Sequence, residues 1–176
     1  MFTIPATGSR PMTFSAEGLP AGLKLDSSTG HITGVIVKAG TYNVKLTAKN
    51  SLGTAERNLR IEVGDKICLT PPMGWNSWNC WGCSVTDENV RQSARAMVEK
   101  GLINYGWTYI NIDDCWHGER DPKTGEIRSN EKFSDMKALA DYVHSLGLKI
   151  GLYTDCGPKT CAGYAGSEGH EEQDIM

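Results

Sequence analysis

The 176-residue sequence lacks any apolar run approaching the roughly 20 residues that a membrane-spanning helix needs, so we expect no membrane insertion. It also lacks a cluster of Lys or Arg that could follow a phosphate backbone, and its net charge of −3 is small, so we expect no nucleic-acid partner. Residues 1–5 have neither the basic start nor the apolar core of a signal peptide, so if the protein is exported we expect its signal outside this chain. The hydrophobic content of 39% is enough for the core of a globular protein.

Motifs for metals and dinucleotides are missing as well. Residues 74–78 (GWNSW) do not supply the G-x-G-x-x-G loop of an open dinucleotide-binding sheet. Cys80 and Cys83 have the spacing of half a zinc site or of a redox pair, but no second Cys pair or His pair completes a metal set. We therefore expect no metal and no cofactor. The six cysteines are then structural disulfides or free thiols, and their number favours an oxidising compartment.

Residues 1–64 have the pattern of an all-β module. Apolar and polar residues alternate in 41–48 and again in 59–63, on either side of a turn at 50–53, which predicts a β-hairpin with one wet face. Shorter strands are expected at 23–25 and 32–37, separated by a turn. We predict five or six strands of an immunoglobulin-like β-sandwich, whose opening one or two strands are cut off because a full sandwich usually has about seven.

Residues 65–72 are expected to be a linker, because paired prolines at 71 and 72 stiffen a chain and stop strands. After it, residues 73–176 alternate strand and helix. The expected elements are strands at 73–77, 109–112 and 148–154, helices from Thr86 to Gly101 and over 135–146, and a polar loop over 117–133. Such a βαβαβ unit fills less than half of the roughly 250 residues of a (β/α)8 TIM barrel, so we interpret it as the first three barrel strands, truncated.

Polar and aromatic residues follow all three strands of this unit. They are Trp75, Asn76 and Trp78 after the first, Asp113 and Asp114 after the second, and Tyr153 and Asp155 after the third. Because carboxyl ends of parallel strands meet at one edge, these side chains are expected close together. Carboxylates that accept hydroxyls and an indole that covers a sugar ring would form a carbohydrate pocket. Two alternatives stay open: the aspartates hold Ca²⁺ or Mg²⁺, or they cap the next segment and the tryptophans belong to the core.

Four segments carry a resemblance to a known family. They are residues 71–79 (PPMGWNSWN), 110–116 (INIDDCW), 139–153 (LADYVHSLGLKIGLY) and 166–174 (GSEGHEEQD). In order and spacing they resemble the amino-terminal third of glycoside hydrolase family 27, the α-galactosidase or melibiase group, over about residues 67–176. Residues 18–23 (GLPAGL) and 29–34 (TGHITG) resemble a small immunoglobulin-like module found beside bacterial extracellular enzymes.

The resemblance implies a fragment of a retaining α-galactosidase that cleaves terminal α-linked galactose, secreted or periplasmic, with carbohydrate as its partner. The implied galactose contacts are Trp78, Asp113, Asp114 and Tyr153, with Cys161 close to the sugar. No catalytic residue is implied within the chain, because the family's nucleophile and acid/base match positions beyond Met176, so the fragment alone is expected to be inactive.

The resemblance also implies a disulfide between Cys83 and Cys115, and it leaves Cys161 unpaired. Cys68, Cys80 and Cys156 have no implied partner. Two alternatives remain for the function: an α-N-acetylgalactosaminidase or β-L-arabinopyranosidase on the same scaffold, and a non-catalytic carbohydrate-binding fragment.

Overall fold

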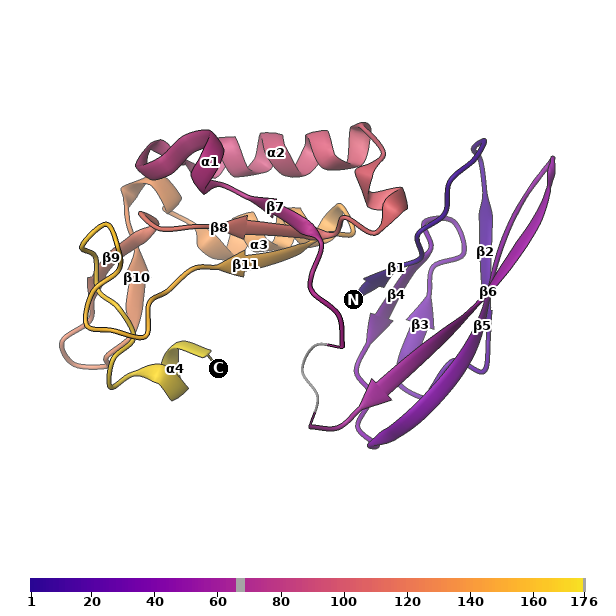
Figure 1. Cartoon of the computed structure of the whole chain (residues 1–176), viewed down its shortest axis with the longest axis horizontal. Coiled ribbons are helices and arrows are strands. Elements are labelled where there is room, and N and C mark those ends of the chain that lie inside the picture. Colours follow the sequence, from indigo (N-terminus) through magenta and orange to yellow (C-terminus); the bar gives the residue numbers. More distant parts are fainter. Residues whose placement is uncertain (66–68, 176) are drawn as a thin grey trace. The chain divides into compact units, whose positions relative to one another are not determined.

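The computed structural model describes residues 1–65 and 69–175, which form two compact units (Figure 1). One unit is Met1–Met73 with Gly101–Thr108, and the other is Gly74–Lys100 with the chain from Tyr109 onward. Part of the predicted linker, including Cys68, lies outside the described residues. The proposed boundaries at residues 65 and 72 therefore stay predictions.

The first unit contains two three-stranded antiparallel sheets that share one core. One sheet has the order β1 (Phe2–Thr3), β4 (His31–Gly34), β3 (Leu23–Leu25), and the other β2 (Thr13–Glu17), β5 (Gly40–Asn50), β6 (Gly53–Val63). The core residues come from both sheets and from the chain beside β1 and β2: Ile4, Met12, Phe14, Ile32, Val44 and Leu46. The same unit includes the short 3-10 helix η2 (Leu102–Tyr105).

The β5–β6 hairpin has its turn where the sequence predicts it, between Asn50 and Gly53. Asn50 closes the turn, because its side-chain oxygen accepts hydrogen bonds from the backbone of Leu52 at 2.9 Å and Gly53 at 3.1 Å. The strand expected at 32–37 ends early, at Gly34. Its φ of 119° and the carbonyl of Gly22, 2.0 Å from where a Cβ would lie, leave room only for glycine.

The second unit contains a parallel sheet in the order β11 (Lys149–Leu152), β8 (Tyr109–Ile112), β7 (Gly74–Asn76). Helix α2 (Asp87–Glu99) connects β7 to β8, and α3 (Met136–Ser145) lies between β8 and β11 along the chain. The central strand is buried at Ile110 and Ile112. Helix residues that contribute to the buried interior are Val90, Ala94, Met97, Leu139 and Val143.

Both long helices begin where their capping residues predict. The Thr86 side chain accepts a hydrogen bond from the backbone of Asn89, whose own side chain accepts one from the backbone of Thr86, forming a capping box. The Asp135 carboxylate accepts a hydrogen bond from the backbone of Ala138 at 2.8 Å. These local bonds satisfy amide groups that the first helical turn leaves unpaired.

The chain between β8 and α3 differs from the predicted loop. Residues 117–133 form the antiparallel hairpin β9 (His117–Arg120) and β10 (Ile127–Ser129), followed by the 3-10 helix η3 (Glu131–Phe133). The polar composition of residues 117–133 predicted a loop, although His117 and Phe133 within it are completely buried. Further short elements that were not predicted include α1 (Trp78–Trp81), η1 (Gly82–Ser84) and α4 (Glu171–Ile175). Across the described residues, no helix combines the length and apolar character needed to cross a membrane.

Candidate functional site

The carboxyl ends of β7, β8 and β11 meet at one edge of the parallel sheet. Strand register pairs Asn76 with Asn111 and Leu152 with Ile112. The backbone ladder continues one residue further on each side, since the Ser77 amide donates to Asn111 at 3.1 Å and the Tyr153 amide donates to Ile112 at 2.9 Å. This edge therefore carries the residues that follow each strand.

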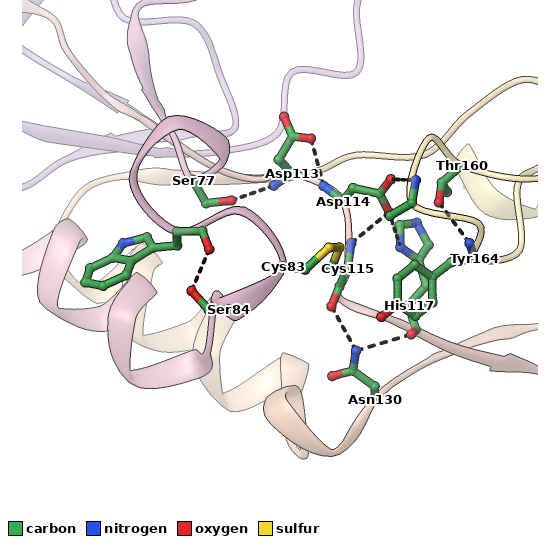
Figure 2. Close-up of a disulfide and its surroundings, with 12 residues drawn as sticks. Ser77, Cys83, Ser84, Asp113, Asp114, Cys115, His117, Asn130, Thr160 and Tyr164 are labelled. Atoms are coloured by element: carbon green, nitrogen blue, oxygen red, sulfur yellow. Dashed lines mark hydrogen bonds and ion pairs between the residues drawn. A yellow bond between two sulfur atoms is a disulfide. The ribbon is translucent and has the colours of Figure 1, made fainter.

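Asp113 is half-buried and is held by the last residue of β7 and the residue after it. The Asn76 amide group donates to its Oδ2 at 2.7 Å, and the backbone of Asp114 donates to its Oδ1 at 2.8 Å. The backbone of Asp113 donates to the Ser77 hydroxyl at 2.9 Å (Figure 2). Asn76 also accepts a hydrogen bond from the backbone of Trp78 at 2.9 Å, so one side chain connects Asp113 to Trp78.

Asp114 is buried, with 1% of its surface exposed. Its Oδ1 accepts a hydrogen bond from the backbone of Cys115 at 2.7 Å, and its Oδ2 accepts one from the backbone of Ala162 at 2.8 Å. These two donors offset the cost of burying a carboxylate. The second of them also places the loop that carries Cys161 beside the end of β8.

Tyr153 and Cys161 complete this region. The Tyr153 hydroxyl lies 3.6 Å from the Cys161 sulfur and donates to Asp155 Oδ2 at 3.2 Å. The hydrogen bond with Cys161 and burial raise the pKa of Tyr153 above its usual range, so the hydroxyl keeps its proton as a donor. The Tyr153 carbonyl accepts a hydrogen bond from the Trp116 indole at 2.8 Å.

The five residues expected to contact a sugar thus lie along one connected set of contacts: Trp78, Asp113, Asp114, Tyr153 and Cys161. Their role as sugar contacts stays a prediction. Within residues 1–65 and 69–175, no group of three or more His, Cys, Asp or Glu side chains is arranged to hold a metal ion.

An ion pair between Arg120 and Asp174 fixes the segment that follows β11 and ends in α4. The sequence did not predict this pair. The Arg120 guanidinium makes two parallel bonds to Asp174, at 2.8 and 2.7 Å, and donates to the carbonyl of Gly166 at 2.9 Å. Asp174 also accepts a hydrogen bond from Ser167, whose hydroxyl lies 2.7 Å from that of Thr154. Both charged side chains are mostly buried, 14% and 6% exposed. Asp174 belongs to the segment 166–174 that resembles the family, but nothing in the sequence connected it to an arginine 54 residues away.

Comparison with known proteins identifies the family. The model of the family described as "Alpha galactosidase A" matches residues 70–176, more than half of the chain. The chain belongs to the alpha-galactosidase A family. A second family model, described as "Putative Ig domain", matches residues 1–64.

Relatives of this alpha-galactosidase family member come from several kingdoms. "Alpha-galactosidase A" of Cellvibrio japonicus is 56% identical over 114 residues, which cover 64% of this chain and 28% of that protein. The alpha-galactosidase of Coffea arabica is 49% identical over 127 residues, covering 70% of this chain and 34% of its own length. The chain thus spans about a third of the curated relatives it matches.

Solved structures agree with this assignment. A Bacteroides fragilis protein described as a "putative alpha-galactosidase/melibiase" is 50% identical, with a TM-score of 0.92 over 98% of this chain and 38% of that one. The alpha-galactosidase of Saccharomyces cerevisiae, solved with raffinose, is 41% identical, with a TM-score of 0.58 over 60% of this chain and 24% of that one. The similarity to the Bacteroides fragilis protein extends over both the immunoglobulin-like module and the alpha-galactosidase portion.

One disulfide fixes the alpha-galactosidase portion beside the aspartates. It joins Cys83 in η1 to Cys115, directly after Asp114, and is the pairing that the family resemblance implied (Figure 2). Cys115 is buried and has a φ of 74°, a conformation that costs free energy for any residue except glycine. Among the described cysteines, Cys80, Cys156 and Cys161 are free thiols.

Removing this disulfide is expected to destabilise the alpha-galactosidase portion. Cys83→Ala with Cys115→Ala should lower its free energy of unfolding by about 2–4 kcal/mol, because the crosslink closes a long loop. Urea unfolding followed by tryptophan fluorescence measures this, since four of the five tryptophans lie in the second unit and only Trp107 lies in the first. Cys80→Ala, which removes an exposed free thiol of the same segment, serves as the matched control and should change little. An unreduced peptide that links Cys80 to Cys115 would contradict the assignment.

Proposed function

We propose that this chain supplies the sugar-gripping part of a retaining α-galactosidase, which hydrolyses terminal α-D-galactosyl residues of oligosaccharides or glycoconjugates. The observation that carries the proposal is the double aspartate at the end of β8, with Tyr153 and Cys161 beside it. The names of the relatives from Cellvibrio japonicus and Coffea arabica support the substrate class.

Each gripping residue has a physical role in this proposal. The carboxylates of Asp113 and Asp114 accept hydrogen bonds from the 4- and 6-hydroxyls of galactose, and charged acceptors make the stronger kind of hydrogen bond. The protonated Tyr153 hydroxyl turns its single proton from Asp155 to the sugar, with Cys161 close to it. Trp78, which is 43% exposed, covers the apolar face of the ring.

Asp113 and Asp114 do not perform the covalent chemistry in this proposal. Retaining hydrolysis needs two carboxyl groups about 5 Å apart on either side of the glycosidic bond, one as nucleophile and one as acid/base. Asp113 and Asp114 are neighbours at the end of one strand, so they are proposed to flank the far side of the bound sugar and not the two sides of its glycosidic bond. We therefore assign the nucleophile and the acid/base to chain beyond Met176, on later strands of a (β/α)8 barrel whose first three strands are β7, β8 and β11.

The proposed setting is outside the cytoplasm, in the periplasm or the extracellular medium. The Cys83–Cys115 disulfide supports it, because structural disulfides persist in oxidising compartments.

Hydrolysis of 4-nitrophenyl α-D-galactoside tests the proposal. The purified 176-residue chain should release no nitrophenol, whereas a polypeptide that continues it through the rest of the barrel should do so, and Asp113→Ala should abolish that activity. Turnover by the 176-residue chain would contradict our assignment of the catalytic carboxylates. An extended polypeptide that folds but releases only a different sugar would contradict the proposed substrate.

A further inference from the structure

His117, at the start of β9, is completely buried among aromatic rings beside the candidate site. Trp116 stacks on its imidazole with ring centroids 4.3 Å apart. Tyr164 stacks on it at 5.8 Å (Figure 2). Tyr153 meets the same ring edge-on at 6.3 Å. Neither ring nitrogen has a hydrogen-bond partner among the described residues. Buried polar groups are nearly always satisfied, so this imidazole calls for a partner.

The nearest carboxylate is that of Asp114, one of the proposed galactose contacts. His117 Nδ1 lies 3.6 Å from Asp114 Oδ1, slightly too far for a hydrogen bond. A shift of less than about 1 Å would make that bond. The same oxygen already accepts a hydrogen bond from Cys115, so a second donor would hold the carboxylate from two directions.

Burial, rather than the charged groups around it, favours the neutral form of the imidazole. Burial lowers the pKa of His117 most, and Arg120 lowers it further, whereas Asp114, Asp174 and the Tyr153 carbonyl act in the opposite direction. A neutral imidazole carries one N–H, and Nδ1 is the nitrogen that faces a carboxylate.

We propose that His117 is a positioning residue that carries its proton on Nδ1 and donates it to Asp114 Oδ1 when a galactoside occupies the site. The inference rests on the proposed function. Asp114 and His117 are already buried, and a sugar bound over the end of β8 lowers the local dielectric further, which strengthens a buried hydrogen bond and favours the short His117–Asp114 distance. His117 thereby fixes the carboxylate that grips the sugar without contacting the sugar.

The tautomer of His117 tests the inference directly. Nitrogen NMR of the 176-residue chain, with and without methyl α-D-galactoside, should show a neutral ring protonated on Nδ1, and this should persist below pH 6.5, where an ordinary histidine becomes charged. A ring protonated on Nε2 in the complex, or a doubly protonated ring at pH 7, would overturn it.

Three substitutions separate positioning from packing. The amide nitrogen of Asn reaches the place of Nδ1, that of Gln reaches the place of Nε2, and Phe fills the space without a donor. His117→Asn should keep galactoside affinity within about threefold, whereas His117→Gln and His117→Phe should weaken it about tenfold, the worth of one hydrogen bond to a charged group. Tryptophan-monitored unfolding checks that each variant is folded.

The outcomes distinguish the two proposals. Wild-type chain that is folded and binds no galactoside would contradict the proposed function, and this inference with it. Wild-type chain that binds galactoside while His117→Phe binds equally well would overturn the role of His117 alone. Equal losses in His117→Asn and His117→Gln would also overturn it, because packing and not the Nδ1 donor would then be responsible.

Discussion

Replacing Asp113 with Asn is expected to weaken binding of methyl α-D-galactoside to this chain at least about 100-fold. The substitution keeps the shape of the side chain but removes the charge, and each hydrogen bond to a charged acceptor is worth about 1.5–3 kcal/mol. The carboxylate lies half-buried between Asn76 and the backbone of Asp114, so it is already oriented before the sugar arrives. Removing a preorganised acceptor costs more binding free energy than removing a mobile one. A mobile side chain must be ordered when the ligand binds, and its removal recovers that entropy, whereas a preorganised side chain has no such entropy to recover.

Isothermal titration calorimetry measures the effect. The matched control is Glu119→Gln, which removes one carboxylate charge at an exposed position of β9 and should leave the affinity unchanged. Equal affinity of Asp113→Asn and wild type would contradict the role of the double aspartate.

Replacing Arg120 with Met is expected to destabilise the alpha-galactosidase portion by about 3 kcal/mol, because it leaves Asp174 buried without its partner. Galactoside binding should weaken as well, since the pair holds the segment that connects Cys161 and Ala162 to α4. The control is Arg128→Met, which breaks the exposed pair with Asp121 and should cost less than about 1 kcal/mol. Urea unfolding of both variants provides the comparison, and equal losses would contradict the structural role of Arg120.

The same pair predicts how stability depends on pH. Arg120 lowers the pKa of Asp174 from 3.8 to about 2, so the folded state binds this proton less readily than the unfolded chain. The stabilisation from the pair is therefore complete above about pH 4 and is lost as the pH falls toward 2. In Arg120→Met, the free energy of unfolding should fall less between about pH 4 and pH 2 than it does in the wild-type chain, because the pair that stabilises the charged Asp174 is gone.

Local patterns predicted most of the fold because local interactions determine it. Thr86 and Asp135 begin α2 and α3 through bonds to residues three positions along the chain. Alternation predicted the β5–β6 hairpin, and the apolar strand before Asp113 placed the aspartates at the edge of the parallel sheet. Asp113 and Tyr153 were expected at this edge because each directly follows a strand, and their role as sugar contacts stays a prediction.

Other parts depend on long-range contacts that no local pattern reports. Arg120 and Asp174 are 54 residues apart, and Asp114 meets Ala162 across 48 residues. The hairpin over 117–129 was missed because its buried anchor is a histidine, a residue whose type alone does not indicate burial. The Cys83–Cys115 pairing came from the family resemblance, since spacing alone left six cysteines with many arrangements.

The central claim is that the end of β8 grips galactose, and titration with two epimers tests it most directly. Methyl α-D-galactoside and methyl α-D-glucoside differ only in the direction of the 4-hydroxyl, which the aspartates are proposed to bind. The 176-residue chain is expected to bind the galactoside at least about 30-fold more tightly than the glucoside, because the glucoside loses one hydrogen bond to a charged group and leaves that acceptor unpaired. Equal affinity for the two sugars, or no binding of either by the folded chain, would contradict it.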